Sequence, residues 1–71
     1  MKKLLKQYNF NSDMKYFEMI IESFINGQIS QAKAQFTAMP KVNRREMVIA
    51  ITGNWNSGLS QEYINTLINL I

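Results

Sequence analysis

Four stretches of the chain carry apolar residues at the spacing of an amphipathic α-helix. In the first, residues 13–26, the apolar side chains recur at steps of three and four residues, which places them on one helical face. They are Met14, Phe17, Ile21 and Phe24. Ser12 precedes the stretch as an N-cap, and Gly27 follows it with the freedom to adopt the left-handed conformation after a last helical turn. The pattern predicts a helix over residues 13–26.

The second and fourth stretches have similar boundary signals. The second runs over residues 30–39 and is ended by Pro40, because the residue before a proline avoids the helical region of backbone space. The fourth runs over residues 60–70 and begins at Ser60, a residue type favoured as an N-cap. Each is therefore predicted to be a short helix.

The third stretch, residues 44–52, contains an apolar run that by propensity alone could form a strand. Asn43 precedes it as a candidate N-cap, and Glu46 follows three residues later, which is the spacing of a capping box. Val42 and Met47 flank this cap as a candidate hydrophobic staple. These signals favour a helix over a strand.

Taken together, the patterns predict an all-α fold. We expect one small domain over residues 1–71, built as a compact bundle of four short helices at about 13–26, 30–39, 44–52 and 60–70. Residues 1–10 are interpreted either as an extra helical turn that docks on the bundle or as a frayed end. A chain of this length buries only about 60% of the surface that its unfolded form exposes, so good packing or a partner is needed.

The composition excludes most catalytic chemistry. The chain has no cysteine and no histidine, so structural zinc sites, thiol nucleophiles and Ser-His-Asp triads are ruled out. The loop from Gly53 to Ser60 has the glycine spacing of a phosphate-binding loop, but Leu59 stands where its lysine is required. Glu18 and Glu22 share a helix face that we expect to be solvated. We therefore expect no catalytic residue, metal, cofactor or small-molecule substrate, and a protein that is not an enzyme.

The cationic side chains suggest one function. The net charge is +3, and Lys41, Asn43, Arg44 and Arg45 place cations and an amide at a predicted turn and helix start. In a helix-turn-helix, such a junction can contact DNA phosphates or guanine. The apolar run that follows leaves few polar positions for base contacts. Nucleic-acid binding is therefore the alternative hypothesis.

The C-terminal third suggests another function, and it is the one we favour. Residues 47–71 contain a single charged side chain, Glu62. The last predicted helix, residues 60–70, carries apolar side chains over a wide arc, and such a helix is either central in a fold or paired with another chain. The predicted partner-binding residues are Trp55, Tyr63, Leu67 and Leu70. Trp55 could anchor a partner or fold back over the edge of the core, and the second position is favoured. The main hypothesis is a non-enzymatic protein-interaction module or homo-oligomer, such as a homodimer.

The N-terminus carries no predicted targeting segment. Lys6 interrupts the apolar run that a signal peptide would need, and no stretch approaches the length of a membrane span, so a cytoplasmic location without membrane contact is expected. The chain is rich in Ile, Asn and Lys, and it contains Asn-Gly-Gln-Ile-Ser-Gln-Ala-Lys at residues 26–33. In these features and in size it resembles small helical proteins of low-GC bacteria and their phages. The resemblance implies a helical fold, host cytoplasm if a phage encodes the chain, and no functional residues.

Overall fold

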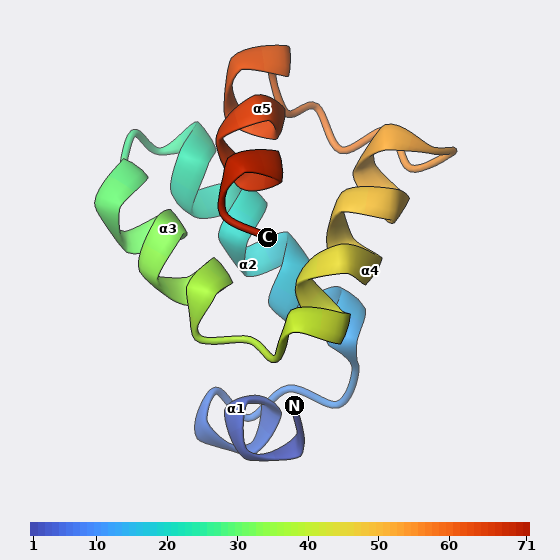
Figure 1. Cartoon of the computed structure of the whole chain (residues 1–71). Coiled ribbons are helices and arrows are strands. Elements are labelled where there is room, and N and C mark those ends of the chain that lie inside the picture. Colours follow the sequence, from blue (N-terminus) through green and yellow to red (C-terminus); the bar gives the residue numbers. More distant parts are fainter.

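The computed structural model describes all 71 residues and shows five α-helices without a strand (Figure 1). They are α1 (Lys2–Gln7), α2 (Asp13–Ile25), α3 (Ile29–Thr37), α4 (Lys41–Thr52) and α5 (Gln61–Asn69). The helix α2 packs against α3, and α4 packs against α5, so the fold consists of two helical hairpins. Figure 1 shows α3 and α4 on either side, with α5 in front of α2. The all-α prediction is confirmed.

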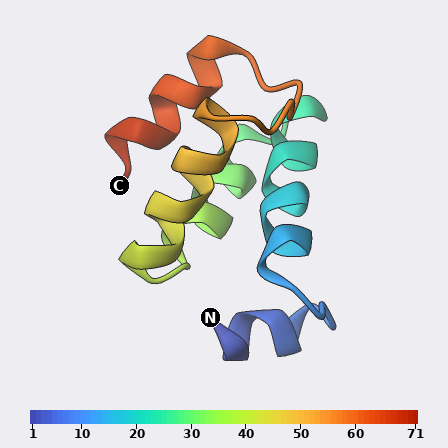
Figure 2. The ribbon, with the colours of Figure 1, turned by 90° about the vertical axis from the view of Figure 1, so that its right-hand side faces the viewer.

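The first ten residues form an ordered end of the bundle. The short helix α1 lies across one end of the two hairpins (Figure 2), and Met1, Leu4 and Leu5 are partly buried against the core. The ring of Tyr8 meets the buried ring of Tyr16 edge-on, with 5.7 Å between centroids. Of the two interpretations of this segment, the docked helical turn is therefore the one observed.

The predicted boundaries of α2 are confirmed, but one of its predicted core residues is wrong. The Ser12 hydroxyl accepts a hydrogen bond from the Lys15 backbone N–H at 3.3 Å, and Gly27 adopts a φ of 79°. Met14, however, is 42% exposed. The buried face is centred on Tyr16 and its neighbours one and two turns later, which puts Met14 at the uncovered edge in the first turn.

The third predicted helix, residues 44–52, corresponds to α4, and its predicted start is wrong. The helix begins earlier, at Lys41, directly after Pro40. Pro40 is the N-cap, and its fixed φ suits a chain that enters a helix. Asn43 is thus inside the first turn, where it is buried and its Nδ2 donates to Asp13 Oδ2 at 3.4 Å. Val42 is exposed while Met47 is completely buried, so the two do not form a staple.

The predicted bounds of the other two helices are close to those observed. Helix α3 begins at Ile29, one residue before Ser30, and its N-cap Gln28 makes no side-chain capping bond. At the start of α5 the Tyr63 backbone N–H donates to the Ser60 hydroxyl at 3.5 Å, which confirms the predicted cap.

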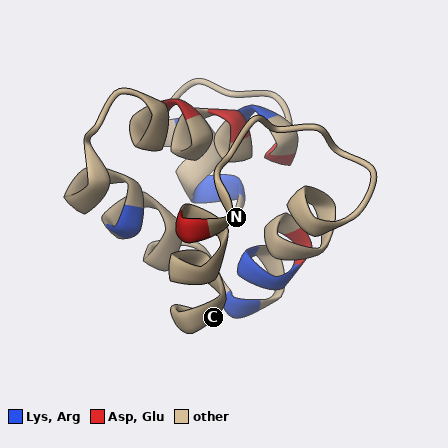
Figure 3. Cartoon of the chain, turned by 90° about the horizontal axis from the view of Figure 1, so that it is seen from above, with Lys and Arg blue, Asp and Glu red and all other residues tan.

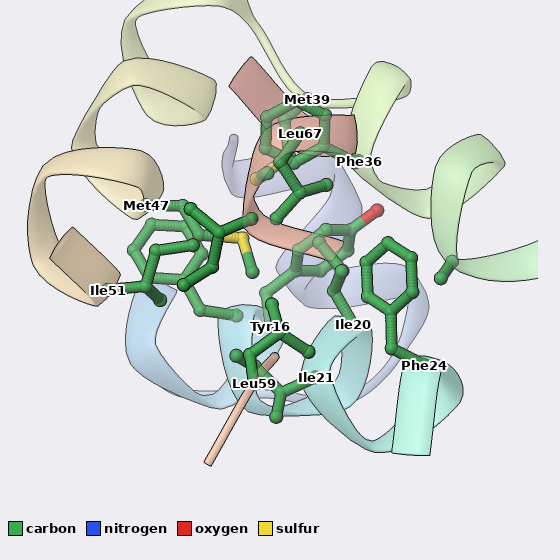
Figure 4. Close-up of a cluster of buried hydrophobic side chains, with 13 residues drawn as sticks. Tyr16, Ile20, Ile21, Phe24, Phe36, Met39, Met47, Ile51, Leu59 and Leu67 are labelled. Carbon is green, nitrogen blue, oxygen red and sulfur yellow. The ribbon is translucent and has the colours of Figure 1, made fainter. Parts of the chain in front are cut away.

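The core draws side chains from α2, α3, α4 and α5, and the largest of them are completely buried (Figure 4). These are Tyr16, Ile20, Phe24, Phe36, Met47 and Leu67. Two hydrogen bonds join α2 and α3 within the core. The Tyr16 hydroxyl donates to the Gln35 backbone oxygen at 2.7 Å, and the Ser23 hydroxyl donates to Gln35 Oε1 at 2.9 Å. Each buried polar group in this pair of contacts thereby has a partner, as interiors require.

Candidate functional site

One of the predicted partner-binding residues, Leu67, is part of the core. Its side chain is 0% exposed, so it cannot touch a partner while the bundle is closed. The prediction failed because α5 lies in front of α2 with one face turned inward, and Ile64 and Leu67 occupy that face. A helix wheel shows how wide an apolar arc is, but it does not show which part a neighbouring helix covers.

The other three predicted partner-binding residues are partly buried at the rim of the core. The Tyr63 ring stacks on Phe24 with 4.8 Å between centroids, and Leu70 packs against the same cluster. Trp55 also packs against the cluster, which confirms the favoured position over the core edge. Most of the apolar surface of these three side chains is therefore buried within the molecule, and only the exposed remainder could contact a partner.

At the C-terminal end of the chain, two aliphatic side chains that were not predicted to bind a partner remain open. Ile68, in the last turn, and the terminal Ile71 are exposed. They follow the buried Ile64 and Leu67 at a spacing of four residues. Exposed apolar side chains are thus present at this end of the chain, although the most exposed one in residues 47–71, Ile49, lies on α4.

The most exposed large aliphatic side chain belongs to α4, and the sequence patterns did not single it out. Ile49 is 70% exposed and Val42 is 62% exposed. They are separated by seven residues, close to two helical turns, so they lie on one line along the helix. Arg45 and Glu46 are also exposed and lie between them, one on each flank. We refer to these four residues as the α4 outer stripe; the seven-residue spacing was the available signal.

The basic residues proposed for nucleic-acid contact are divided by the fold. Lys41 and Arg45 are exposed. Arg44 instead donates from Nη1 to the Leu70 backbone oxygen at 3.2 Å, and its Nε is buried without a hydrogen-bond partner. A cation on the last carbonyl groups of a helix stabilises that helix end, so Arg44 acts as a tie between α4 and α5. With Asn43 buried as well, two of the four predicted residues remain available.

The structure brings together α2 and the loop between α4 and α5, two segments for which no sequence pattern predicted a contact. A surface groove of about 440 Å³ is lined by Glu18, Ile21, Glu22, Ile25, Trp55 and Ser57. The two glutamates are exposed, as expected. What the sequence patterns could not show is that the loop between α4 and α5 folds back over this face of α2. We call this feature the acidic groove.

The one perturbed titratable group in the core has a structural role. Burial raises the pKa of the Tyr16 hydroxyl to about 12, with a smaller contribution from the neighbouring Tyr8. The phenol is therefore neutral and acts as a hydrogen-bond donor at physiological pH. No group of three or more Asp, Glu, His or Cys side chains is arranged to hold a metal ion. None of the five helices has the length and apolar character of a membrane-spanning segment.

Comparisons with known proteins leave the functional class open. No protein-family model, curated protein or solved structure matches this chain.

Proposed function

We propose that this chain is a non-enzymatic protein-interaction module that associates with a second copy of itself through the α4 outer stripe. The observation that carries the proposal is the exposure of Val42 and Ile49, which are 62% and 70% exposed, on one line of a helix. Ile25 on α2 is exposed to a similar extent, but it lies beside two glutamates and not in an apolar line. Aliphatic side chains that line up on an exposed helix are a common way for two helices to pair.

The charges of the stripe favour self-association over an unrelated partner. Arg45 and Glu46 flank the line of Val42 and Ile49 on opposite sides and carry opposite charges. If two copies pair with their α4 helices parallel around a two-fold axis, Arg45 of one copy meets Glu46 of the other on both flanks. An antiparallel pair would instead bring like charges together. The parallel arrangement is thus self-complementary in both apolar and charged groups.

The expected dimer is weak. A stable interface buries about 800 Å² on each partner, which would be roughly a sixth of the 4598 Å² of surface that this chain exposes. Two aliphatic side chains per copy, each worth about 1.5–3 kcal/mol when fully buried, must offset the entropy lost on association. We expect a dissociation constant on the order of 100 µM.

Sedimentation equilibrium over a range of concentrations around that value tests the proposal. Ile49→Lys should give a monomer at all concentrations, and it should fold normally because the side chain it replaces is mostly exposed. Met14→Lys is the matched control, since it introduces the same charge at an exposed apolar position outside the stripe. It should dimerise like the unchanged protein.

A charge exchange tests the geometry of the pair. Arg45→Glu should weaken the parallel dimer, because it places two glutamates on each flank. Exchange of both charges, Arg45→Glu with Glu46→Arg, should restore it. If the unchanged protein stays monomeric at millimolar concentration, self-association is disproved. If the double exchange fails to restore the dimer, the parallel arrangement is disproved.

A further inference from the structure

The acidic groove combines a carboxylate pair with an apolar floor. Glu18, Ile21, Glu22 and Ile25 all line it, and their spacing of three and four residues places them on a single face of α2. Ile21 is buried, whereas Ile25 is exposed beside the two glutamates. Neither glutamate forms an ion pair within 4.0 Å in the chain. The groove therefore presents two unpaired negative charges next to apolar surface.

The opposite wall of the groove, formed by Trp55 and Ser57, is fixed by the backbone of its loop. The Trp55 backbone N–H donates to the Ala50 oxygen at the end of α4, at 3.3 Å. The Ser57 backbone N–H donates to the Trp55 oxygen at 3.0 Å, and the Ser57 hydroxyl accepts from the Leu59 N–H at 3.2 Å. Leu59 is buried in the core, which anchors the far end of this turn. The backbone that carries the indole is thus held in place before any ligand arrives, and the indole itself packs against the core. Both reduce the entropy cost of binding.

We propose that the acidic groove binds a positively charged side chain, preferably arginine, on a basic segment of a separate partner polypeptide. The alkyl part of such a side chain would lie on Ile21 and Ile25, since long cationic side chains bury their stems and keep their charged ends near solvent. The guanidinium would be paired with the carboxylates of Glu18 and Glu22 and would lie near the Trp55 ring, where a cation is attracted to the aromatic face.

The charge distribution of the molecule favours this occupant. Asp13, Glu18 and Glu22, three of the five acidic residues, belong to α2. Figure 3 shows the acidic segments of α2 on the side of the molecule away from the C-terminus, whereas basic segments of α4 lie close to that terminus. A cationic segment would be attracted to the α2 side and oriented by it.

A metal ion is a poorer occupant, because no third Asp, Glu, His or Cys side chain joins the two carboxylates, and neither of them is held in a fixed coordination geometry. A wholly apolar ligand is also disfavoured, since it would take water away from the glutamates without pairing their charges. The inference rests on the proposed function in taking the ligand to be a polypeptide. It uses none of the residues of the α4 outer stripe, so the two can fail separately.

Fluorescence titration offers a direct test, because Trp55 is the only tryptophan in the chain. The probe is a capped Arg-Leu-Arg-Leu tetrapeptide, and the control probe has glutamine in place of arginine. The arginine peptide should change the Trp55 emission with saturation, and the glutamine peptide should bind at least about tenfold more weakly because it lacks the charge. Ile49→Lys should leave this titration unchanged.

Matched variants separate the groove from the overall charge of the protein. Glu18→Gln with Glu22→Gln should weaken binding of the arginine peptide by at least about tenfold. At low micromolar protein, well below the dissociation constant expected for the α4 dimer, Glu46→Gln with Glu62→Gln removes the same total charge from exposed positions outside the groove. It should change peptide binding by less than about twofold. All four positions are exposed, so both double variants should keep the circular-dichroism spectrum of the unchanged protein.

Three results would overturn the proposal. The first is a titration without a saturable change in emission, and the second is equal binding of the two peptides. The third is an equal loss in both double variants, which would show long-range attraction alone. If emission changes on dilution of the protein without peptide, and Glu18→Gln with Glu22→Gln abolishes that change, the occupant is a second copy of this chain and the separate partner is disproved.

Discussion

The Tyr16 hydroxyl provides the sharpest test of how this small bundle is held together. It is completely buried on α2 and donates to the backbone oxygen of Gln35 at 2.7 Å. Gln35 lies in the last turn of α3, where backbone carbonyl groups lack a partner within the helix. The N–H of Met39, four residues later, would be the helical partner of the Gln35 oxygen, but it donates to the Phe36 oxygen. Tyr16 thus completes the end of a neighbouring helix. In Tyr16→Phe the ring remains and this carbonyl is left without its partner.

The loss of this hydrogen bond sets the expected decrease in the free energy of unfolding. A buried acceptor that loses its hydrogen bond destabilises a protein by about 1–3 kcal/mol. A 71-residue domain has a total stability of roughly 4–11 kcal/mol, so the change would be a substantial fraction of it. The melting temperature should fall by at least about 4 °C, since 1 kcal/mol corresponds to about 4–8 °C in a domain of this size.

Urea unfolding followed by circular dichroism measures the effect, with Tyr8→Phe as the control. Tyr8 is exposed, and loss of its hydroxyl should change the free energy of unfolding by no more than about 0.5 kcal/mol. A Tyr16→Phe protein as stable as the unchanged one would refute the role of the hydrogen bond. An equal loss in both variants would refute its assignment to the buried hydroxyl.

The pH dependence provides an independent check of the burial of the same hydroxyl. The pKa of Tyr16 is raised from 10.0 to about 12 in the folded protein, so the folded state holds this proton more tightly than the unfolded state does. The resulting stabilisation is complete below pH 10.0 and is lost as the pH rises toward about 12. Across that interval the unchanged protein should lose more stability than Tyr16→Phe does. If both proteins lose stability equally over this interval, burial does not raise the pKa of Tyr16.

The remaining predictions concern the core and the basic turn. Leu67→Ala should lower the free energy of unfolding by about 2–5 kcal/mol, as measured by urea denaturation, because it opens a cavity at a completely buried position. Leu70→Ala, at a partly buried position, should cost clearly less, and an equal cost would contradict the inward orientation of α5. For nucleic acid, the combined variant Lys41→Ala/Arg45→Ala should change the salt slope of any binding in a mobility-shift titration by no more than about 1.8, since two side chains contribute about 0.9 each. A salt dependence that remains in this variant would show that other cationic side chains also reach the phosphates.

Helix ends that depend on a local capping hydrogen bond were predictable from the sequence, whereas the start of α4, where Asn43 makes a distant contact, was not. Ser12 and Ser60 cap their helices as expected, because a capping bond joins a side chain to a backbone group three residues later and needs no distant partner. The start of α4 was predicted at Asn43, but this side chain is bonded to Asp13 across the bundle. Its role depends on a contact between residues 30 positions apart. Local capping rules contain no information about such a contact.

The candidate surfaces show a similar division. The position of Trp55 at the core edge was foreseen from its residue type, and the exposure of Glu18 and Glu22 from their helical spacing. That these three side chains share one groove was not foreseeable, because the loop and α2 are brought together only by the packing of both hairpins. The outer position of Ile49 was missed for the same reason.

The all-α class and the number of principal helices could be predicted from the amino-acid sequence, since periodicity and capping act over a few residues. Which side of each helix is covered depends on how the helices pack together. Leu67 and Ile49 are both aliphatic residues on short amphipathic helices, and one is completely buried while the other is the most exposed large apolar side chain. Burial is a property of what packs against a residue, and that neighbour is supplied by the arrangement of the whole bundle.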